Sequence, residues 1–444
     1  MWHDLIERNV LVCPVCRSSS LEISSQISCV SCGARYLIED GVPIFIRPDD
    51  LIDLPRQVMR SMGLADSTYA QVATALAGLT RYKIRFSAAE FSNFFARLER
   101  NNVPAARKLS ALEVELALDN IELLAAYLPP QMQKGTREYR TVRIKNNSDV
   151  CLFSSEVFPL YMSYRLIQKN GITVADEPKR TELPIVLRPG EELSVPVLVE
   201  IPQKLEGQVT INFCFVLENV RWFDKRPLGS FDVQVEKYVS TIDRRTNNTL
   251  KEFDFAEDMR RSAEFLKLAI DRIPPPENRK KRVLEIGAGV HPMILQANIG
   301  DCELIASDLS LVQQQFCKII YERHEANQKG LFAVAAIDAM NLPFVDGEID
   351  AIVCCAALHH FPMPDVLLRK MKDALSRDGC FIALREPCFV NPYDGLYRSE
   401  LANGFDEQMF ELSEWEEIVK RGGLKIADCQ VDFGCSLKME LVKS

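Results

Sequence analysis

The chain has 444 residues, enough for roughly two to four domains, so one function need not span all of it. Hydrophobic residues make up 47% and charged residues 26% of the sequence, which is typical of a globular protein and excludes a largely disordered chain. Lys and Arg number 53 against 62 Asp and Glu, a net charge of −9, so no overall positive field would hold a phosphate backbone. Nucleic acid is therefore a disfavoured partner.

The sequence also argues against a membrane span. No apolar run approaches the roughly 18 to 20 residues needed to cross a bilayer, and the N-terminal residues lack a basic segment followed by an apolar core. We therefore expect a cytoplasmic protein. Most of the 14 cysteines lie in apolar contexts, where a thiol behaves as a small hydrophobic group, so we expect no disulfide framework.

Four cysteines near the N-terminus form two CxxC pairs, Cys13 with Cys16 and Cys29 with Cys32. Their spacing lets two tight turns bring four thiolates around a zinc ion. Disulfides are disfavoured by the cytoplasmic setting, and a redox CxxC is disfavoured because there are two copies and no thioredoxin-like unit. Zinc is the favoured metal, and rubredoxin-type iron remains the alternative.

Together with residues 34–46, these cysteines resemble the zinc ribbons of methyltransferase-activator type over residues 8–48. The resemblance implies a zinc-ribbon domain at 1–48. A zinc ion saturated by four thiolates has no open coordination position, so we expect it to have a structural or docking role.

Residues 49–135 show helical patterns. Capping-box signals occur at Ser87–Glu90 and Ser110–Glu113, and the first precedes apolar residues at helical spacing over 91–98. Such a stripe is typical of a face buried against another element, so we assign this helical region no chemistry.

Residues 136–240 favour an antiparallel β-sandwich, because several β-rich segments are separated by Asn-Gly and Pro-Gly turns. The β-rich segments are 141–147, 195–201 and 209–217. With the motifs at 161–165, 188–191 and 218–223, this region resembles the Ig-like modules of bacterial polysaccharide-biosynthesis proteins. The module is either a structural spacer or a glycan-binding unit. In the second case, the rings that would stack on sugars are those of Tyr161, Tyr164 and Trp222.

The C-terminal region opens with an apolar strand, an acid and a glycine turn at Arg282–Gly289, where backbone can pass close to a ligand. A second apolar strand ends at Asp308, whose carboxylate can take both hydroxyls of a ribose. These two elements alone also fit NAD, although Pro292 replaces the third glycine of the NAD fingerprint. The chain has no Gly-Lys-Ser/Thr motif for a triphosphate.

Three further motifs decide between the cofactors: 336–344, 350–360 and 375–384. With them, residues 281–385 resemble the class I S-adenosylmethionine (SAM) dependent methyltransferases, specifically the small-molecule type 11 group. The resemblance implies a Rossmann-like methyltransferase domain at 241–444, in which Glu285 and the glycine turn line the methionine end, Asp308 binds ribose, and Asp338 meets adenine. The cofactor-binding residues implied are Glu285, Gly287, Ala288, Gly289, Asp308, Leu309, Asp338 and Ala339. His291 departs from the family pattern, which usually has a glycine at that position.

Three residues near the ends of later strands are candidates for catalysis. His359 and His360 follow the fourth strand, and one of them is a candidate general base; the alternative is that the pair packs beneath the cofactor without moving a proton. Glu386 follows the next strand and would orient an acceptor, unless it only closes a surface turn. The candidates for acceptor contact, or for the core of a lid, are Tyr393, Tyr397 and Phe405.

The sequence thus predicts a multidomain protein with a zinc ribbon, a helical segment, an antiparallel β-sandwich and a Rossmann-like methyltransferase domain. Its expected activity is SAM-dependent methyl transfer to a small acceptor, a hydroxyl of a sugar or nucleotide-sugar in surface-glycan biosynthesis, with glycan-assembly proteins as partners. One alternative is methylation of a tRNA, ribosomal or protein substrate. The other is a non-catalytic scaffold in glycan assembly.

Overall fold

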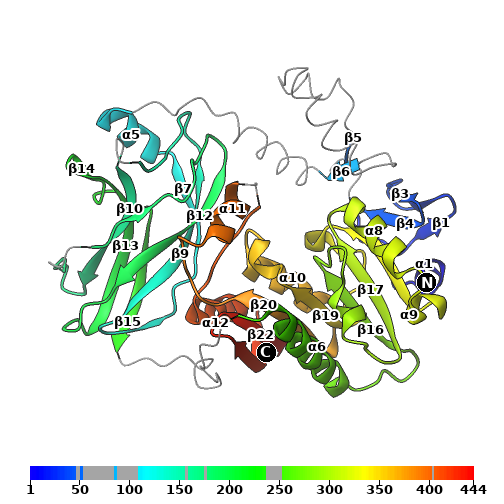
Figure 1. The fold of residues 1–444 in the computed structure, drawn as a ribbon. Coiled ribbons are helices and arrows are strands. Elements are labelled where there is room, and N and C mark those ends of the chain that lie inside the picture. Colours follow the sequence, from blue (N-terminus) through cyan, green and yellow to red (C-terminus); the bar gives the residue numbers. More distant parts are fainter. Residues whose placement is uncertain are drawn as a thin grey trace.

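The computed structural model describes residues 1–46, 51–53, 85–87, 109–155, 159–174, 178–236, 253–402 and 405–444. Figure 1 shows a β-rich unit on one side, an α/β unit on the other, and a small N-terminal sheet at the outer edge of the α/β unit. This arrangement confirms the prediction of a multidomain chain with a Rossmann-like C-terminal part. None of the helices in the described ranges is long and apolar enough to cross a membrane.

The N-terminal unit is a small sheet preceded by one short helix. Its elements are α1 (Trp2–Glu7), β1 (Leu21–Ile23), β2 (Gln26–Cys29), β3 (Arg35–Glu39) and β4 (Val42–Phe45). Neighbouring strands pair antiparallel. Tyr36 and Phe45 are fully buried and their ring centroids lie 5.9 Å apart, so two large aromatic residues supply much of this unit's small core.

The middle unit consists of two sheets that share one hydrophobic core. One sheet has the order β11-β10-β13-β15-β8, with β14 paired to β13, and the other has the order β12-β9-β7. All the pairings are antiparallel except that of β8 with β15. The elements are α5 (Ala111–Leu118), β7 (Ile121–Ala126), β8 (Gln131–Gln133), β9 (Arg137–Asn146), β10 (Leu160–Gln168), β11 (Thr181–Glu182), β12 (Glu192–Glu200), β13 (Gly207–Leu217), β14 (Arg221–Trp222) and β15 (Gly229–Glu236).

The structure changes the prediction for residues 49–135. The capping box at Ser110–Glu113 is confirmed at the start of α5, but β7 and β8 belong to the two sheets, so the β-rich unit begins before residue 136. The β7 sequence lacks alternation and looks helical, yet pairing with β9 overrides its propensity. The apolar stripe at 91–98 lies outside the described residues, whereas Ser87 ends β6 (Arg85–Ser87), which pairs with β5 (Leu51–Asp53).

The C-terminal unit alternates strands and helices. Its elements are α6 (Phe255–Arg272), β16 (Lys281–Ile286), α7 (Met293–Gln296), β17 (Cys302–Asp308), α8 (Leu311–Tyr321), α9 (Glu325–Gln328), β18 (Phe332–Ile337), η3 (Ala339–Asn341), β19 (Ile349–Cys355), η4 (Leu358–His360), α10 (Pro364–Ala374), β20 (Leu375–Pro387), α11 (Gly395–Ala402), α12 (Leu412–Arg421), β21 (Leu424–Asp432) and β22 (Ser436–Lys443). The strand order is β18-β17-β16-β19-β20-β22-β21, parallel from β18 to β20. Because the order reverses at β16, the carboxyl ends of β16 and β19 flank the crevice where such sheets bind ligands.

The N-terminal sheet continues the C-terminal one. Strand β4 pairs in parallel with β18, with Ile44 opposite Ala336 and Phe45 opposite Ile337. The two units therefore form one eleven-stranded sheet with the order β1-β2-β3-β4-β18-β17-β16-β19-β20-β22-β21. Val12 donates its N–H to the carbonyl of Pro343 at 3.0 Å, which adds a second backbone contact. The four-cysteine unit is therefore docked on the C-terminal unit of its own chain.

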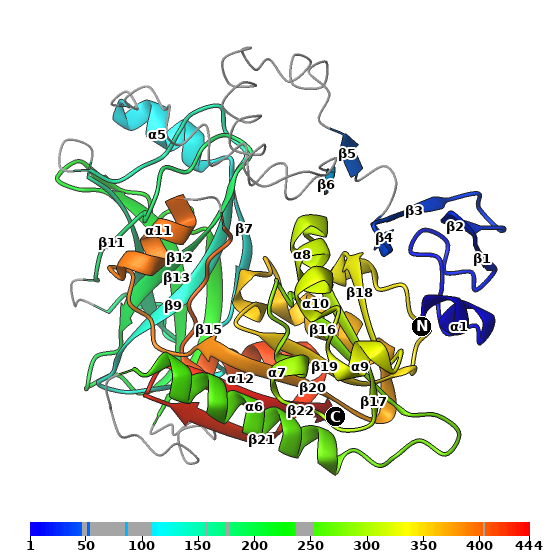
Figure 2. The ribbon, with the colours of Figure 1, turned by 45° about the vertical axis from the view of Figure 1, so that its right-hand side comes forward.

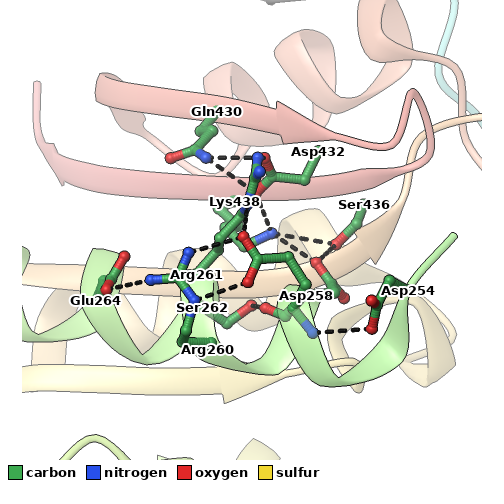
Figure 3. Close-up of polar contacts among 11 residues, drawn as sticks. Asp254, Asp258, Arg260, Arg261, Ser262, Glu264, Gln430, Asp432, Ser436 and Lys438 are labelled. Atoms are coloured by element: carbon green, nitrogen blue, oxygen red, sulfur yellow. Dashed lines mark hydrogen bonds and ion pairs between the residues drawn. The ribbon is translucent and has the colours of Figure 1, made fainter. Parts of the chain in front are cut away.

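A buried ionic network fastens helix α6 to the edge of the sheet (Figure 3). The Nζ atom of Lys438, on β22, donates to Asp258 of α6 at 2.8 Å and to Asp432 of β21 at 2.7 Å. Arg385 of β20 donates to the other oxygen of Asp258 at 2.8 Å, and Arg261 donates to Asp432 at 2.7 Å. Each buried charge thus has partners of the opposite sign, which burial of charge requires.

The middle unit packs closely on the C-terminal unit. Figure 2 shows α11 lying against the strands of the middle unit, and Tyr397 and Leu401 of α11 belong to that unit's hydrophobic core. Thr141 of β9 donates its N–H to the buried carboxylate of Glu414 at 2.7 Å. The two units therefore share core residues instead of meeting only at a polar surface.

Candidate active site

A glycine bend follows β16 at the carboxyl edge of the sheet. Gly287 and Gly289 have φ angles of 63° and 56°, in the left-handed region that favours glycine. A Cβ atom on Gly287 would lie 2.8 Å from the Cβ atom of Ala357, just after β19. Ala288 is buried, and its N–H donates to the carbonyl of Ser307 on β17 at 2.9 Å. The bend therefore brings backbone from three neighbouring strands together.

Glu285 stabilises the helix that follows the bend. Its two carboxylate oxygens accept the N–H groups of Met293 at 3.0 Å and Ile294 at 2.9 Å, at the start of α7. Burial raises the pKa of Glu285 to about 7, against the effect of these two hydrogen bonds. Both oxygens accept backbone N–H groups, so Glu285 holds the start of α7 against the end of β16.

Asp308 and Gln314 enclose the other side of the bend. Asp308 accepts the N–H of Gly289 at 3.0 Å on one oxygen and the N–H of Ser310 at 2.8 Å on the other. Burial raises the pKa of Asp308 despite these hydrogen bonds. Gln314 of α8 donates from Nε2 to the carbonyl of Gly289 at 3.1 Å, while its buried Oε1 atom has no partner in the described part of the chain. No sequence motif pointed to Gln314.

Asp338 lies one strand further along the same edge. It caps η3 by accepting the N–H of Met340 at 2.8 Å, and its second oxygen accepts Nδ2 of Asn341 at 2.6 Å. Ala339 is buried in this turn, and Leu309 is half-buried after the end of β17. Since Asp308 lies opposite Ala336 in the sheet, Asp338 comes two residues beyond it. All the predicted cofactor residues thus lie at one edge of three adjacent strands.

The edge fits an adenosine cofactor that carries an amino-acid group. Acids end β17 and β18, where hydroxyl and amino groups can be bound, and the orphaned Oε1 atom of Gln314 offers one further acceptor beside the bend. His291, at the position where a glycine was expected, is exposed and its Nδ1 atom lies 3.3 Å from the hydroxyl of Tyr321. The departure from the family pattern therefore falls on an exposed loop residue.

Glu386 and His359 form a tight buried pair next to the bend. Glu386 is 0% exposed and accepts the N–H groups of Ala357, Leu358 and His359 at 3.1–3.2 Å. The Nδ1 atom of His359 lies 2.7 Å from an oxygen of Glu386. The alternative that Glu386 merely closes a surface turn is wrong, because three backbone donors of the η4 turn hold its carboxylate inside the protein.

Glu407 completes this cluster and was not predicted from the sequence. Its Oε2 atom lies 3.3 Å from Nε2 of His359 and 3.1 Å from Nδ1 of His360. Glu407 lies in an irregular segment and contacts residues 47 or more positions earlier in the chain. No local motif signals such a contact. We call His359, His360, Glu386 and Glu407 the histidine–carboxylate cluster.

The cluster gives its two histidines opposite protonation preferences. Burial alone would lower the pKa of His359, but the charges of Glu386 and Glu407 raise it to about 10. Burial and the charge on His359 lower the pKa of His360 to about 4. At neutral pH, His359 is therefore cationic and His360 is neutral, so only His360 is in the form that accepts a proton.

The middle unit helps to hold this cluster. Gln408 donates from Nε2 to the carbonyls of His359 at 3.1 Å and Phe361 at 2.7 Å, and its Oε1 atom accepts the hydroxyl of Ser194 on β12 at 2.8 Å. Arg143 of β9 donates to Asp406 at 2.9 Å. The segment that carries Glu407 is thus fixed from both sides, which the sequence did not indicate.

The aromatic residues named as acceptor contacts divide into two groups. Tyr393 is 68% exposed and Phe405 is 48% exposed, and the ring of Phe405 lies 6.1 Å from that of His360. Tyr397 is buried in the core of the middle unit and is therefore not an acceptor contact. Its helical spacing on α11 serves packing.

Two of the three rings named for sugar stacking on the middle unit are already in use. Tyr164 is buried, and its hydroxyl accepts the N–H of Glu200 at 2.8 Å. The ring of Trp222 is covered by the guanidinium of Arg165, whose carbon lies 3.7 Å from the ring centroid. Tyr161 is half-buried on β10. Two of these rings therefore serve the middle unit itself.

The four N-terminal cysteines come together as predicted. Their sulfur atoms all lie within 4.8 Å of one another, and two pairs, Cys13 with Cys32 and Cys16 with Cys29, are 3.6 Å apart. Four sulfurs at about 2.3 Å from a tetrahedral zinc ion would be about 3.8 Å apart, so the set fits zinc. The hydroxyl of Tyr36 lies 3.0 Å from Cys13 Sγ and supports that ligand. None of the fourteen cysteines forms a disulfide.

Comparison with known proteins agrees with this site. Residues 284–383 match the family model Methyltransf_11, described as a methyltransferase domain. Among solved structures, the chain is similar to the citrinin polyketide synthase CMeT domain (16% identity, TM-score 0.36, covering 42% of this chain and 52% of that one). It is also similar to the YcgJ protein from Bacillus subtilis (18% identity, TM-score 0.31, covering 41% of this chain and 99% of that one). A third similar structure is geranyl diphosphate C-methyltransferase from Streptomyces coelicolor (13% identity, TM-score 0.34, covering 45% of this chain and 89% of that one). The match thus spans about half of the polyketide synthase domain.

The C-terminal unit therefore contains a methyltransferase domain over residues 284–383. The glycine bend, Asp308 and Asp338 all lie within the matched segment.

Proposed function

We propose that this chain is a SAM-dependent methyltransferase that acts on a hydroxyl group of a small acceptor, and that the acceptor is a sugar or nucleotide-sugar in surface-glycan biosynthesis. The observation that carries the proposal is the close approach of the cofactor edge to the histidine–carboxylate cluster. A Cβ atom on Gly287 would touch Ala357, two residues before His359. The cofactor edge and groups able to handle a proton are thus neighbours.

The cofactor edge would hold SAM through its predicted residues. Asp308 would bind the ribose hydroxyls, Asp338 and Ala339 would meet adenine, and the Gly287–Gly289 bend would face the methionine end. When bound, SAM supplies an activated methyl group, and transfer to a hydroxyl releases one proton. The protein's own task is to fix the orientation of the reactants, which is worth roughly 7 to 11 kcal/mol.

The histidine–carboxylate cluster would manage that proton. His359 and His360 are the proposed catalytic residues, since they follow Ala357, which approaches the bend, and of the two only the neutral His360 can take the proton. Glu386 is a positioning residue, because its carboxylate is spent on the η4 backbone and on His359. Activation of the acceptor hydroxyl by such a group is worth on the order of 10² to 10⁴ in rate.

The exposed aromatic ring beside the cluster supports a sugar as the acceptor. Phe405 lies next to His360, and an aromatic face suits the C–H side of a pyranose. The contact of Ser194 with Gln408 supports a role near the acceptor for the middle unit, whose sequence resembles Ig-like modules of polysaccharide biosynthesis. The N-terminal unit would hold zinc, with a structural role at the outer edge of the sheet.

A labelled-methyl assay tests the acceptor class. The full chain is incubated with labelled SAM and a cell extract that has been separated into glycan, RNA, protein and lipid pools. We expect label in the glycan pool. Label confined to RNA or protein would overturn the sugar proposal, and calorimetry that detects no SAM binding would overturn the cofactor site itself.

A pair of variants tests the aromatic contact. Phe405→Ala should raise the KM for the acceptor roughly two- to tenfold without changing the affinity for SAM, because a stacked ring contributes about 0.5–1.5 kcal/mol. Phe253→Ala is the matched control: Phe253 is equally exposed, at 48%, but packs against Phe433, away from the cluster. Equal KM values for the two variants would exclude Phe405 from acceptor binding.

A further inference from the structure

The histidine–carboxylate cluster has the layout of a metal site. Nitrogen atoms of His359 and His360 and an oxygen of Glu407 all lie within 4.8 Å of one another, on side chains that are largely buried. This set is separate from the four cysteines and comes from two segments of the chain, the η4 turn and the loop before α12. It contains two imidazoles and one carboxylate, which is the His₂Glu donor set of many catalytic zinc sites.

Two of the three separations between donor atoms in the set fit a metal ion. Donors bound at about 2.1 Å with angles between octahedral and tetrahedral would lie about 3.0 to 3.4 Å from one another. The Oε2 atom of Glu407 lies 3.3 Å from Nε2 of His359 and 3.1 Å from Nδ1 of His360. Both separations fall inside that range.

Hydrogen bonding alone does not account for these contacts. Among the described residues, Nδ1 of His360 and Oε2 of Glu407 are buried and have no aligned hydrogen-bond partner, although they are only 3.1 Å apart. Buried polar atoms without partners are rare in folded proteins and indicate an unfilled interaction. An ion between the three side chains would satisfy both atoms.

The surroundings of the cluster are those that metal ligands usually have. Glu386 binds Nδ1 of His359 at 2.7 Å, which leaves Nε2 as the ligand and fixes the ring orientation, the usual carboxylate–histidine–metal arrangement. Gln408 fixes the backbone of His359 through its carbonyl, so the ligands are held from behind.

We propose that His359 Nε2, His360 Nδ1 and Glu407 bind a divalent zinc ion beside the methyl-transfer site, and that the ion displaces the proton that His359 holds in the metal-free cluster. Three protein ligands leave an open position, which a hydroxyl oxygen of the acceptor would occupy. The ion would lower the pKa of that hydroxyl, so that its proton would pass to solvent water while the oxygen takes the methyl group and the bond between that methyl carbon and the sulfonium sulfur of SAM breaks. The binding of the ion is independent of the proposed function, and only its role in acceptor activation rests on it.

Zinc titration by calorimetry tests the site on the full-length chain that retains the zinc of its N-terminal unit. The wild type should take up one additional zinc ion. Glu407→Gln and His360→Asn should weaken that binding at least 100-fold, because each removes one of three ligands. His3→Gln, which removes an exposed histidine from α1, should bind like the wild type.

Thermal unfolding of each variant confirms that it is folded, and His360→Asn alters a partly exposed side chain in case Glu407→Gln does not fold. A wild-type chain that takes up no additional zinc, or a Glu407→Gln chain that binds it unchanged, would overturn the proposal in favour of a proton shared within the cluster. Methyl transfer by a chain without a second zinc would refute only the role of the ion in activating the acceptor. Binding of the second zinc by a chain that labels no glycan would refute only the proposed acceptor class.

Discussion

Lys438→Met should destabilise the methyltransferase domain more than any change to its exposed charges. Lys438 is 0% exposed and donates to Asp258 at 2.8 Å and to Asp432 at 2.7 Å (Figure 3). Methionine fills a similar volume but supplies no charge. Removing one partner from a buried ion pair costs about 3–5 kcal/mol, because the remaining carboxylate is left poorly compensated.

The structure puts the cost near the lower end of that range. After the substitution, Asp258 still pairs with Arg385 at 2.8 Å and Asp432 with Arg261 at 2.7 Å, so neither carboxylate is left alone. A loss of about 3 kcal/mol corresponds to a fall of roughly 6–12 °C in the thermal midpoint for a domain of 150–250 residues. Differential scanning fluorimetry of the full chain measures this shift.

Arg260→Met serves as the matched control, since Arg260 lies on the same helix and forms ion pairs that are exposed to solvent. Its midpoint should stay at the wild-type value. The network also has a pH signature: burial raises the pKa of Asp258 and Asp432, but their hydrogen bonds with Lys438 outweigh it and lower both values. Their stabilising effect is therefore present above about pH 3.8 and is lost as the pH falls through the lowered values. Equal midpoints for Lys438→Met and Arg260→Met at neutral pH would refute this reasoning.

Three further outcomes are expected. Cys16→Ser, or chelation of the ribbon metal, should lower the thermal midpoint in fluorimetry and weaken SAM binding in calorimetry, because a four-thiolate site contributes directly to folding. An unchanged affinity for SAM would show that the ribbon does not support the cofactor edge. Gly287→Val should weaken SAM binding at least tenfold in calorimetry, because the new Cβ atom would lie 2.8 Å from that of Ala357 and the φ angle of residue 287 is 63°. Gly300→Val is the control and should leave SAM binding unchanged, because a Cβ atom there would lie in open space. Glu285 has a raised pKa of about 7, so its contribution to stability is full below about pH 4.5 and is lost as the pH rises through 7. Denaturation between pH 5 and 8 should therefore show a fall, on the order of 3 kcal/mol, that Glu285→Gln lacks.

The cofactor edge was predictable because each of its parts is local in sequence. A strand, an acid and a glycine bend lie within eight residues at Arg282–Gly289, and Asp308 and Asp338 each follow an apolar strand directly. Parallel strands bring their carboxyl ends to one edge whatever the loops between them do. Spacing pointed to Asp308, and the family resemblance added Asp338 beside it.

The contacts between units were not predictable in this way. Glu407 reaches His359 from an irregular segment, and Gln408 reaches Ser194 across 214 positions. The pairing of β4 with β18 joins Ile44 to Ala336, and nothing in the β4 sequence distinguishes an edge strand that extends its own sheet from one that docks on another. Such long-range pairings are decided by packing, and a single sequence does not record them.

The two accessory units support opposite sides of the same edge. Strand β4 pairs with β18 at Ala336 and Ile337, directly before Asp338, so the ribbon supports the side proposed for the adenine. The middle unit holds Gln408 through Ser194, and Gln408 in turn fixes the backbone of His359, so this unit supports the side proposed for the acceptor. A methyltransferase domain needs its cofactor and its acceptor held in fixed relation, because orientation supplies most of its rate. Each accessory unit thus contacts one of the two sides at which, in the proposed function, the reactants would meet.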